Sequence, residues 1–377
     1  MIQEILVEER ALGYKLTRQV LSRASVTIKE IPTYEDYPFP FRPWPELLSW
    51  GKRRLFLLRY QGRFFRNCPG TVRYLCCGYR IFHFGEGCPL DCSYCILQAY
   101  LNRPGLKLWA NLWEEGWPEL EAALREACQR GQVLRVGTGE FADSLALEPL
   151  CGVAEELARR FVEMEAPAVL ELKTKVALSE KWLSRLPKSP RIILSWSLNT
   201  ERMSCEEEQG AAPLLERLSS AARAAREGFS VAFHFDPLIL YPETPEDYLP
   251  VVDQVFQLVA AERIVWISLG TLRFIPDLKE IAEDRFPETR IFCGEFITGL
   301  DGKRRYFRPL RVAAYRKIFQ RIKEHAPEVC VYLCMESPEV WREAFGFTPQ
   351  ERGGLPRMLD EAARRVCDLR PLSGNPE

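Results

Sequence analysis

Three cysteines give this sequence its clearest chemical potential. They lie in the stretch Cys88-Pro-Leu-Asp-Cys92-Ser-Tyr-Cys95, with the spacing C-x3-C-x2-C and an aromatic residue before the last cysteine. Three thiolates on one short loop can hold three irons of a [4Fe-4S] cluster, which leaves the fourth iron open to a substrate or cofactor. A zinc site would need a fourth ligand, which is missing nearby, and the other alternative is chance clustering among thirteen cysteines. We therefore predict an iron–sulfur cluster on Cys88, Cys92 and Cys95.

The elements that position this loop are predicted to be alternating strands and helices. The stretch Tyr79-Arg-Ile-Phe-His-Phe84 has strand character and leads into the loop through Gly85 and Gly87. Six β/α units in series predict a parallel sheet, most simply an open barrel, in which catalytic residues lie at the C-terminal ends of the strands. The candidate strands cover residues 79–84, 133–138, 168–173, 191–197, 229–235 and 263–269, and helical stretches such as 148–165 and 211–227 lie between them.

Polar side chains follow each of the later strands, where the barrel would open. After the second strand comes Gly137-Thr-Gly-Glu140, whose glycines let the backbone approach a ligand and whose carboxylate could accept a hydrogen bond from a cofactor's ammonium group. Each of these residues alone would be an ordinary loop residue, but a polar residue at every strand exit predicts a pocket. The others are Lys173 and Lys175, Ser197 and Asn199, His234 and Asp236, and Thr271 and Arg273.

A basic and aromatic stretch precedes the cysteine loop. Residues 51–80 contain eight cations, among them Arg63 and Arg66, and no acidic side chain, and aromatic residues are interleaved with the cations. Cations neutralise phosphates and flat rings stack on bases, so the stretch is a candidate surface for a polyanion. The alternative is a solvated charged face whose aromatic residues belong to the core. A second basic-aromatic run covers residues 302–308.

The chain is predicted to have three parts. These are a small N-terminal α/β domain with a basic linker (residues 1–70), the barrel (71–290) and a C-terminal extension packed on the barrel (291–377). In the extension, Cys330 and Cys334 flank an apolar tripeptide. One interpretation is a second metal cluster that adds Cys68, Cys76 or Cys77, and the other is a buried strand with core cysteines.

Composition narrows the class of protein. Hydrophobic residues make up 47% of 377, which allows a large core, and no apolar run is long enough to span a membrane. The N-terminus lacks a signal-peptide pattern, and thirteen cysteines without export indicate a reducing compartment, so we expect a cytoplasmic protein. The net charge of −1 excludes a chain that binds nucleic acid through an overall basic charge.

Together these features resemble one family, the spore photoproduct lyases and their relatives. These are radical S-adenosylmethionine enzymes that reverse a thymine–thymine adduct in DNA, and the resemblance covers nearly the full chain. The motifs that carry it are Glu9-Arg10-Ala11-Leu12-Gly13-Tyr14-Lys15-Leu16, Cys68-Pro69, the run from Gly87 to Gln98, Trp109-Ala110-Asn111 and Thr174-Lys175. The resemblance implies a partial (β/α)6 TIM-like barrel with a small N-terminal α/β domain, which agrees with the strand pattern.

The same resemblance implies a [4Fe-4S] cluster and S-adenosyl-L-methionine as cofactors. The amine and carboxylate of the latter would chelate the open iron, and one electron would cleave it into methionine and a 5'-deoxyadenosyl radical. Tyr94 resembles the family's aromatic residue beside the adenine, and Lys175 and Ser197 match residues that reach the cofactor. The remaining expected members of the cofactor pocket are Asn199, His234 and Asp236. Arg273 and the run Lys303-Arg304-Arg305-Tyr306 match basic positions toward DNA.

Two departures from the family concern the return of a hydrogen atom. The lyases have a hydrogen-donating cysteine after the second strand, where this chain has Glu140. They also have a tyrosine directly after the third cluster cysteine, where this chain has Ile96. The resemblance therefore implies an intact radical-generating half and an altered radical-quenching half. Glu140 and Tyr94 remain the predicted catalytic residues, and Glu140 is expected to bind the amine of the cofactor.

Three functional hypotheses follow. The first is a carbon–carbon lyase that repairs a thymine-dimer-type lesion in DNA, with reduced flavodoxin or ferredoxin as electron donor and no membrane partner. The second is the same radical chemistry on another substrate, such as an RNA base, a peptide or a small molecule, which the two departures and the pI of 6.4 favour. The third is a non-catalytic iron–sulfur protein that binds nucleic acid.

Overall fold

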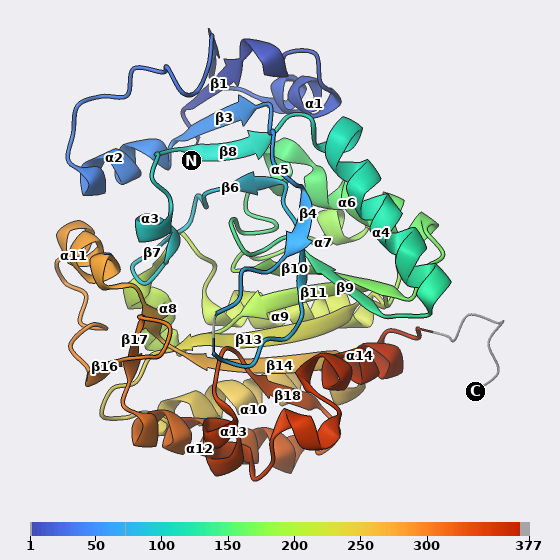
Figure 1. Ribbon diagram of the computed structural model, residues 1–377, viewed down its shortest axis with the longest axis vertical. Helices are drawn as coiled ribbons and strands as arrows, with labels where there is room; N and C mark the ends of the chain where they lie inside the picture. Colours follow the sequence, from blue (N-terminus) through green and yellow to red (C-terminus); the bar gives the residue numbers. More distant parts are fainter. Residues whose placement is uncertain (1, 72, 370–377) are drawn as a thin grey trace.

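The computed structural model describes residues 2–71 and 73–369, and its centre is a curled sheet of eight strands (Figure 1). The strands are β4 (Phe65–Asn67), β5 (Arg80–Phe82), β9 (Leu134–Gly137), β10 (Ala168–Thr174), β11 (Ile192–Ser197), β13 (Ser230–Leu238), β14 (Ile264–Thr271) and β18 (Cys330–Leu333). Their order is β18-β14-β13-β11-β10-β9-β5-β4, and all neighbours are parallel except β5 and β4. The sheet forms a half-barrel whose parallel strands end on one side.

The central strands are apolar runs because both faces of this sheet are covered. Every residue of β14 is buried, and Val231, Phe233 and Phe235 of β13 are fully buried. Helices surround the half-barrel (Figure 1). They are α4 (Trp117–Arg130), α6 (Val153–Glu163), α9 (Leu214–Arg226), α10 (Leu249–Leu258), α12 (Arg308–His325), α13 (Pro338–Phe345) and α14 (Leu355–Val366).

Helix α14 illustrates how the sequence produces this cover. Its buried side chains are Leu355, Met358, Leu359, Ala362 and Ala363. These recur at intervals of three and four residues, so they form one apolar stripe along the helix. The stripe packs against β14 and β18, while Arg357, Glu361 and Arg365 are exposed and Asp360 pairs with the buried Arg135 at 2.7 Å.

A second sheet lies beside the half-barrel, at the top of Figure 1. It consists of β1 (Glu4–Glu8), β2 (Thr27–Ile31), β3 (Arg54–Leu58), β6 (Gly85–Glu86) and β8 (Leu106–Trp109), and helices α1 (Lys15–Arg23) and α2 (Trp44–Gly51) accompany it. The strand order is β2-β1-β3-β8-β6, and only the pair β8/β6 is antiparallel among the described strands of this sheet.

Small elements surround the cysteine loop. They are β7 (Asp91–Cys92), α3 (Leu97–Tyr100), α8 (Glu201–Glu207), β12 (Glu208–Gln209), β15 (Arg273–Phe274), α11 (Pro276–Arg285), β16 (Phe296–Thr298) and β17 (Arg304–Tyr306). β7 pairs with β12, which follows β11 in the chain, and β15, β17 and β16 form a three-stranded sheet.

The predicted partial barrel with a small N-terminal α/β unit is confirmed, and a strand lies in each of the six predicted ranges. The first is shorter than predicted, because β5 ends at Phe82 and the chain then crosses to the other sheet as β6. β18 is a seventh parallel strand from the C-terminal part. The domain limits at residues 70 and 290 stay predictions, although the eight-stranded sheet contains strands from both sides of each limit. Among the described residues, no helix is long and apolar enough to cross a membrane.

Candidate active site

The three predicted cluster cysteines lie on one loop beside the ends of the barrel strands. Cys88 follows β6, Cys92 is in β7, and Cys95 precedes α3. The loop is tied to the segment after β9, because the backbone N–H of Gly87 donates to the carbonyl of Phe141 at 2.8 Å. Cys88 and Cys95 line the same small hollow. Burial raises the pKa of the Cys88 thiol to about 12, and it also raises the pKa of Cys92, to which Cys95 and Cys88 contribute as neighbours.

Side chains from outside the loop hold its backbone in place. The ammonium group of Lys52 donates to the carbonyl of Cys88 at 3.0 Å. The side-chain amide of Gln98 donates to the carbonyls of Cys92 and Ser93 at 3.1 and 2.8 Å. Gln98 ends the run from Gly87 that carries part of the family resemblance, and these two hydrogen bonds give it a structural role.

The loop fits a [4Fe-4S] cluster with three protein ligands. Its one acidic residue, Asp91, is bound by Arg285 at 2.8 Å to both carboxylate oxygens and by Lys52 at 3.3 Å, so it is engaged elsewhere. Within residues 2–71 and 73–369, no three His, Cys, Asp or Glu side chains converge closely enough for a single metal ion. Thiolates on a cube-shaped cluster each bind a different iron and so stand further apart.

Tyr94 is held in a buried polar network behind the loop. Its hydroxyl donates to Glu208, whose other carboxylate oxygen lies 2.5 Å from a guanidinium nitrogen of Arg217. The side-chain amide of Asn199 lies 3.5 Å from Glu208, and the ammonium group of Lys175 lies 5.8 Å from the centre of the Tyr94 ring. Burial raises the pKa of Tyr94, and the charge of Glu208 raises it further. Tyr94, Lys175 and Asn199 therefore gather next to the cysteine loop.

Glu140 and Lys175 are connected to the barrel in different ways. A carboxylate oxygen of Glu140 lies 3.4 Å from the ammonium nitrogen of Lys173. Asp143, three residues after Glu140, accepts from the hydroxyl of Thr174 at 2.7 Å and from the backbone N–H of Lys175 at 2.9 Å. Asp143 thereby joins the segments that follow β9 and β10 and sets the position of Lys175.

His234 is fixed within the barrel rather than free to turn. One ring nitrogen lies 2.7 Å from the Ser268 hydroxyl, and the other lies 2.7 Å from a carboxylate oxygen of Glu171. Burial favours the neutral form of Glu171, but the charge and hydrogen bond of His234 outweigh it and bring the pKa of Glu171 to about 2. His234 and Glu171 therefore form a fixed polar part of the barrel interior.

Asp236 and Arg273 form a two-pronged ion pair. The two guanidinium nitrogens of Arg273 lie 3.1 and 3.0 Å from the two carboxylate oxygens of Asp236. Gly270 makes room for this pair, since a Cβ atom there would lie 2.7 Å from the Asp236 carboxyl carbon. One of the nitrogens also lies 3.4 Å from the sulfur of Cys334. The family resemblance placed Arg273 toward DNA, but its guanidinium is bound to Asp236 and forms part of the wall at the barrel mouth.

These groups surround a cavity of about 110 Å³. The predicted site residues in its wall are Glu140, Ser197, His234, Asp236 and Arg273. Four cysteines join them in the wall, namely Cys68, Cys76, Cys77 and Cys334. The predicted residues thus form two groups, one beside the cysteine loop and one around this cavity.

The predicted nucleic-acid residues divide by the face on which they lie. Along β17, Arg304 is exposed, whereas Arg305 and Tyr306 are buried. Arg305 pairs with Asp301 at 2.7 Å, and Tyr306 accepts a hydrogen bond from a backbone N–H of the segment after β13. The expectation that Arg305 and Tyr306 face DNA is therefore wrong for this structure, because side chains along a strand point inward or outward according to how the strand packs. Lys303 is half-buried at the start of the strand.

The basic stretch 51–80 is largely engaged within the protein. Arg59 pairs with Glu115 at 3.1 Å. Arg66 lies over the ring of Phe141 at 4.7 Å, and Arg63 is exposed. The aromatic residues of the stretch that are fully or nearly fully buried are Phe56, Phe64 and Phe65. This arrangement favours the alternative in which the aromatic residues belong to the core.

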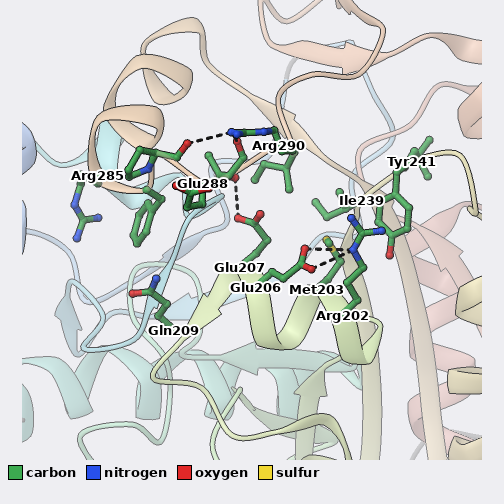
Figure 2. A pocket seen from close by; sticks show the side chains of 15 residues that line it. Arg202, Met203, Glu206, Glu207, Gln209, Ile239, Tyr241, Arg285, Glu288 and Arg290 are labelled. Carbon is green, nitrogen blue, oxygen red and sulfur yellow. Dashed lines mark hydrogen bonds and ion pairs between the residues drawn. The ribbon is translucent and has the colours of Figure 1, made fainter.

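A larger pocket, of about 520 Å³, lies between helix α8 and the segment that follows α11 (Figure 2). Helix α8, the segment 239–241 and the end of α11 form its walls, and none of the predicted site residues lines it. Glu207 in its wall points toward the segment after α11 and accepts from the hydroxyl of Thr289 at 2.8 Å (Figure 2). Glu207 also accepts from the hydroxyl of Ser93, so this pocket and the cysteine loop share one side chain.

Sequence reasoning missed several residues that organise the site. Glu208 and Arg217 were not singled out, because a run of acidic residues and an arginine on a helix are common on protein surfaces. Asp143 had a signal, since it lies in the same glycine-rich strand exit as Glu140. The sequence had suggested that Cys330 and Cys334 join Cys68, Cys76 or Cys77 in a second metal cluster. The structure brings Cys334 to those three cysteines but leaves Cys330 out of the cavity, and this stays an untested hypothesis for a cluster.

Comparisons with known proteins agree on one family. A family model described as spore photoproduct lyase matches residues 77–323. The spore photoproduct lyase of Bacillus subtilis (strain 168) is 21% identical over 246 residues, which cover 64% of this chain and 68% of the relative. The spore photoproduct lyase of Clostridium acetobutylicum is 20% identical over 296 residues, which cover 77% of this chain and 84% of the relative.

Solved structures of spore photoproduct lyase share this fold. A mutant with dinucleoside spore photoproduct superposes with a TM-score of 0.76 at 17% identity, over 89% of this chain and 99% of that chain. A double mutant with bound AdoMet and dinucleoside spore photoproduct has a TM-score of 0.74, also at 17% identity and over the same shares of the two chains.

Proposed function

The chain belongs to the spore photoproduct lyase family, and from this premise we propose that it repairs a thymine-dimer-type lesion in DNA by radical S-adenosylmethionine chemistry that cleaves a carbon–carbon bond. The observation that carries the proposal is the three-cysteine loop, braced by Gln98 and Lys52, beside a polar cavity at the ends of the barrel strands. Active sites in barrels of parallel strands lie at this end.

The two groups of site residues would have different roles, one in binding the cluster and the cofactor and the other in binding the lesion. Cys88, Cys92 and Cys95 would hold the cluster, and Tyr94 and Lys175 would lie against S-adenosyl-L-methionine beside it. When bound, cluster and cofactor together would supply a carbon radical able to abstract a hydrogen atom from the substrate. Ser197 and Asn199 belong to the same proposal, with Asn199 acting through the buried network that fixes Tyr94.

The cavity would take the reacting part of the lesion. Glu140, His234 and Asp236 lie in its wall, and their partners Lys173, Glu171 and Arg273 hold them there. Fixed polar groups in a confined space can orient a base by its edge. In this proposal Glu140 contacts the amine of the cofactor or a polar edge of the base.

The lesion would be flipped out of the DNA stack, at a cost of a few kcal/mol that damage lowers. Arg63 and Arg304 are exposed, and Arg66 and Lys303 are half-buried near them in the chain. We assign to these four the contacts with phosphates. Arg273 contributes to the cavity wall instead, because Asp236 neutralises it. The electron would come from a reduced flavodoxin- or ferredoxin-type protein.

The test is anaerobic reconstitution with iron and sulfide, followed by dithionite and S-adenosylmethionine. 5'-Deoxyadenosine is measured by chromatography, with and without a DNA oligomer that carries the thymine adduct, and Cys92→Ala is the control. Formation of 5'-deoxyadenosine together with two restored thymines supports the proposal. If the wild-type protein assembles its cluster but forms no 5'-deoxyadenosine, the assignment as a radical enzyme is wrong.

A second candidate is the same chemistry on another substrate, such as an RNA base, a peptide or a small molecule. Glu140 and Ile96, at the two positions where the family places its hydrogen-returning residues, favour it. The outcome that selects this candidate is 5'-deoxyadenosine without conversion of the adduct. DNA binding that does not weaken with salt would point the same way, since several phosphate contacts give a steep salt dependence.

A further inference from the structure

Four cysteine side chains line the cavity at the barrel mouth. Cys68, Cys76 and Cys77 reach it from the segment between β4 and β5, and Cys334 reaches it from the end of β18. Most of the remaining wall is charged or polar, so these thiols are not simply packed in an apolar core. An S–H bond is weaker than an aliphatic C–H bond, so a thiol can give a hydrogen atom to a carbon radical.

Cys334 is the thiol that the fold holds most firmly. Its backbone N–H donates to the carbonyl of Leu269 at 2.9 Å, which fixes the end of β18 against β14. Its sulfur lies 3.4 Å from a guanidinium nitrogen of Arg273, and Asp236 immobilises that guanidinium. Cys334 directly follows β18, which ends at Leu333, so these two contacts anchor it at the end of the strand.

The other thiols are less suited to give a hydrogen atom. Cys76 is exposed, and its hydrogen bond with Cys77 lowers its pKa, which favours the thiolate, the form that has no S–H bond to give. The side chain of Cys77 is engaged in that same hydrogen bond. Cys68 directly follows β4, as Cys334 follows β18, and burial raises the pKa of both thiols, to about 11 for Cys68, so both keep their S–H bond. The sulfur of Cys68 contacts the backbone of Gly70 in the same loop, whereas the sulfur of Cys334 contacts the immobilised guanidinium of Arg273 in the cavity wall, and this contact distinguishes Cys334.

We propose that Cys334 gives a hydrogen atom to the substrate radical formed in this cavity, an inference that rests on the proposed function. The S–H bond of Cys334 breaks, a C–H bond forms on the fragmented substrate, and a sulfur radical remains on Cys334. In the proposed chemistry 5'-deoxyadenosine would hold the hydrogen atom taken from the substrate and give it back to the sulfur, so that the S–H bond forms again and the unpaired electron returns to the adenosyl carbon. The sequence is therefore redox-neutral and consumes no further oxidant or reductant.

Cys330 provides a matched control, because it begins β18 and Cys334 directly follows that strand. Its sulfur lies 4.0 Å from the carbonyl of Met358 in α14, so it faces the helix cover, and it does not line the cavity. Both cysteines are half-buried, and replacing either with alanine removes one thiol from this short segment. Only Cys334→Ala removes a thiol from the cavity.

The first measurement does not depend on turnover. The reconstituted protein, without reductant or S-adenosylmethionine, is treated with N-ethylmaleimide in the presence or absence of the dinucleoside thymine adduct, and each cysteine is quantified by mass spectrometry. We expect the adduct to slow labelling of Cys334 about tenfold at saturation, while labelling of the exposed Cys205 is unchanged. Equal labelling of Cys334 with and without the adduct overturns the proposal.

The second measurement compares wild type, Cys334→Ala and Cys330→Ala for restored thymine per 5'-deoxyadenosine. We expect this ratio to fall at least about tenfold in Cys334→Ala and to be unchanged in Cys330→Ala. In D2O the exchanged S–D group should place one deuterium in the wild-type product, and the residual product of Cys334→Ala should lose this label. Equal iron content, and 5'-deoxyadenosine formation no lower than in wild type, show that the variants are folded.

The outcomes separate the two proposals. If wild type converts the adduct and Cys334→Ala keeps both the ratio and the label, Cys334 is not the donor although the substrate is right. If a serine at this position, Cys334→Ser, retains the ratio, the role is structural and the proposal also fails. If wild type forms 5'-deoxyadenosine without converting the adduct, the substrate is wrong and the assignment of Cys334 falls with it.

Discussion

Glu208→Gln tests whether the buried ion pair behind the cysteine loop holds that region together. The side chains of Arg217 and Glu208 are 0% and 1% exposed, and the charged atoms are 2.5 Å apart. Glutamine keeps the shape and an acceptor for the hydroxyl of Tyr94, but it removes the negative charge. The remaining partners of Arg217 are two backbone carbonyls and the hydroxyl of Ser204, which are neutral.

The substitution therefore leaves a buried cation without a counter-charge, which costs about 3–5 kcal/mol. Solvent screening does not reduce this figure, because neither side chain is exposed to water. At about 2 °C per kcal/mol for a chain of this size, we expect the melting temperature to fall by about 6–10 °C. The assay is differential scanning fluorimetry of the apo protein at pH 7, since a bound cluster would add its own stabilisation.

Glu206→Gln is the matched control on the same helix, α8. Glu206 is 53% exposed and pairs with Arg202 at the surface at 3.3 Å, so its loss should cost less than about 1 kcal/mol. We expect its melting temperature to stay within about 2 °C of wild type. If the melting temperature of Glu208→Gln equals that of this control, the neutral partners suffice to stabilise Arg217, and the reasoning from the buried charge is refuted.

Three further predictions concern the cysteine loop, the pair of Glu171 and His234 within the barrel, and the two arginines of β17. Gln98→Ala removes the amide that binds two loop carbonyls, so iron affinity measured by competition with a chelator should fall about 10- to 100-fold. Burial disfavours the Glu171 anion, but His234 lowers the pKa of Glu171 from its ordinary 4.5 to about 2. Since the pKa of Glu171 is lower in the folded state, its carboxylate adds roughly 3 kcal/mol to the free energy of unfolding above pH 4.5, and this contribution is lost as the pH falls to 2. The free energies of unfolding of wild type and Glu171→Gln, measured with urea, should therefore converge as the pH falls through this range. A difference between them that does not change with pH would contradict this prediction. Arg304→Ala should lower the slope of log DNA affinity against log salt by about 1 without changing the melting temperature, whereas Arg305→Ala should lower the melting temperature, because Arg305 is buried against Asp301. Equal behaviour of the two arginine variants in both assays would show that the inward and outward assignment along β17 is wrong.

The sequence by itself determined the features that depend on neighbouring residues in the chain. The spacing of Cys88, Cys92 and Cys95 places three thiols on one loop whatever the rest of the chain does. Apolar runs separated by helical patterns predicted six parallel strands and, with them, the end of the barrel at which polar residues would meet. Glu140, His234 and Asp236 were found in this way, because strand direction alone carries their side chains to the same end.

The tertiary structure decided everything that joins distant segments. Nothing in the chain near Arg305 distinguishes it from Arg304, and only the packing of β17 turns one inward and the other outward. Arg273 has the composition of a phosphate contact, but the fold pairs it with Asp236.

The same holds for the cavity thiols. Cys334 meets Cys68, Cys76 and Cys77 because β18 joins the sheet next to β14, although it lies far away along the chain. The physical reason is that a contact between distant segments depends on the pairing order of strands and on which face each side chain occupies. Periodicity and spacing specify neither, since they describe a segment without its partners.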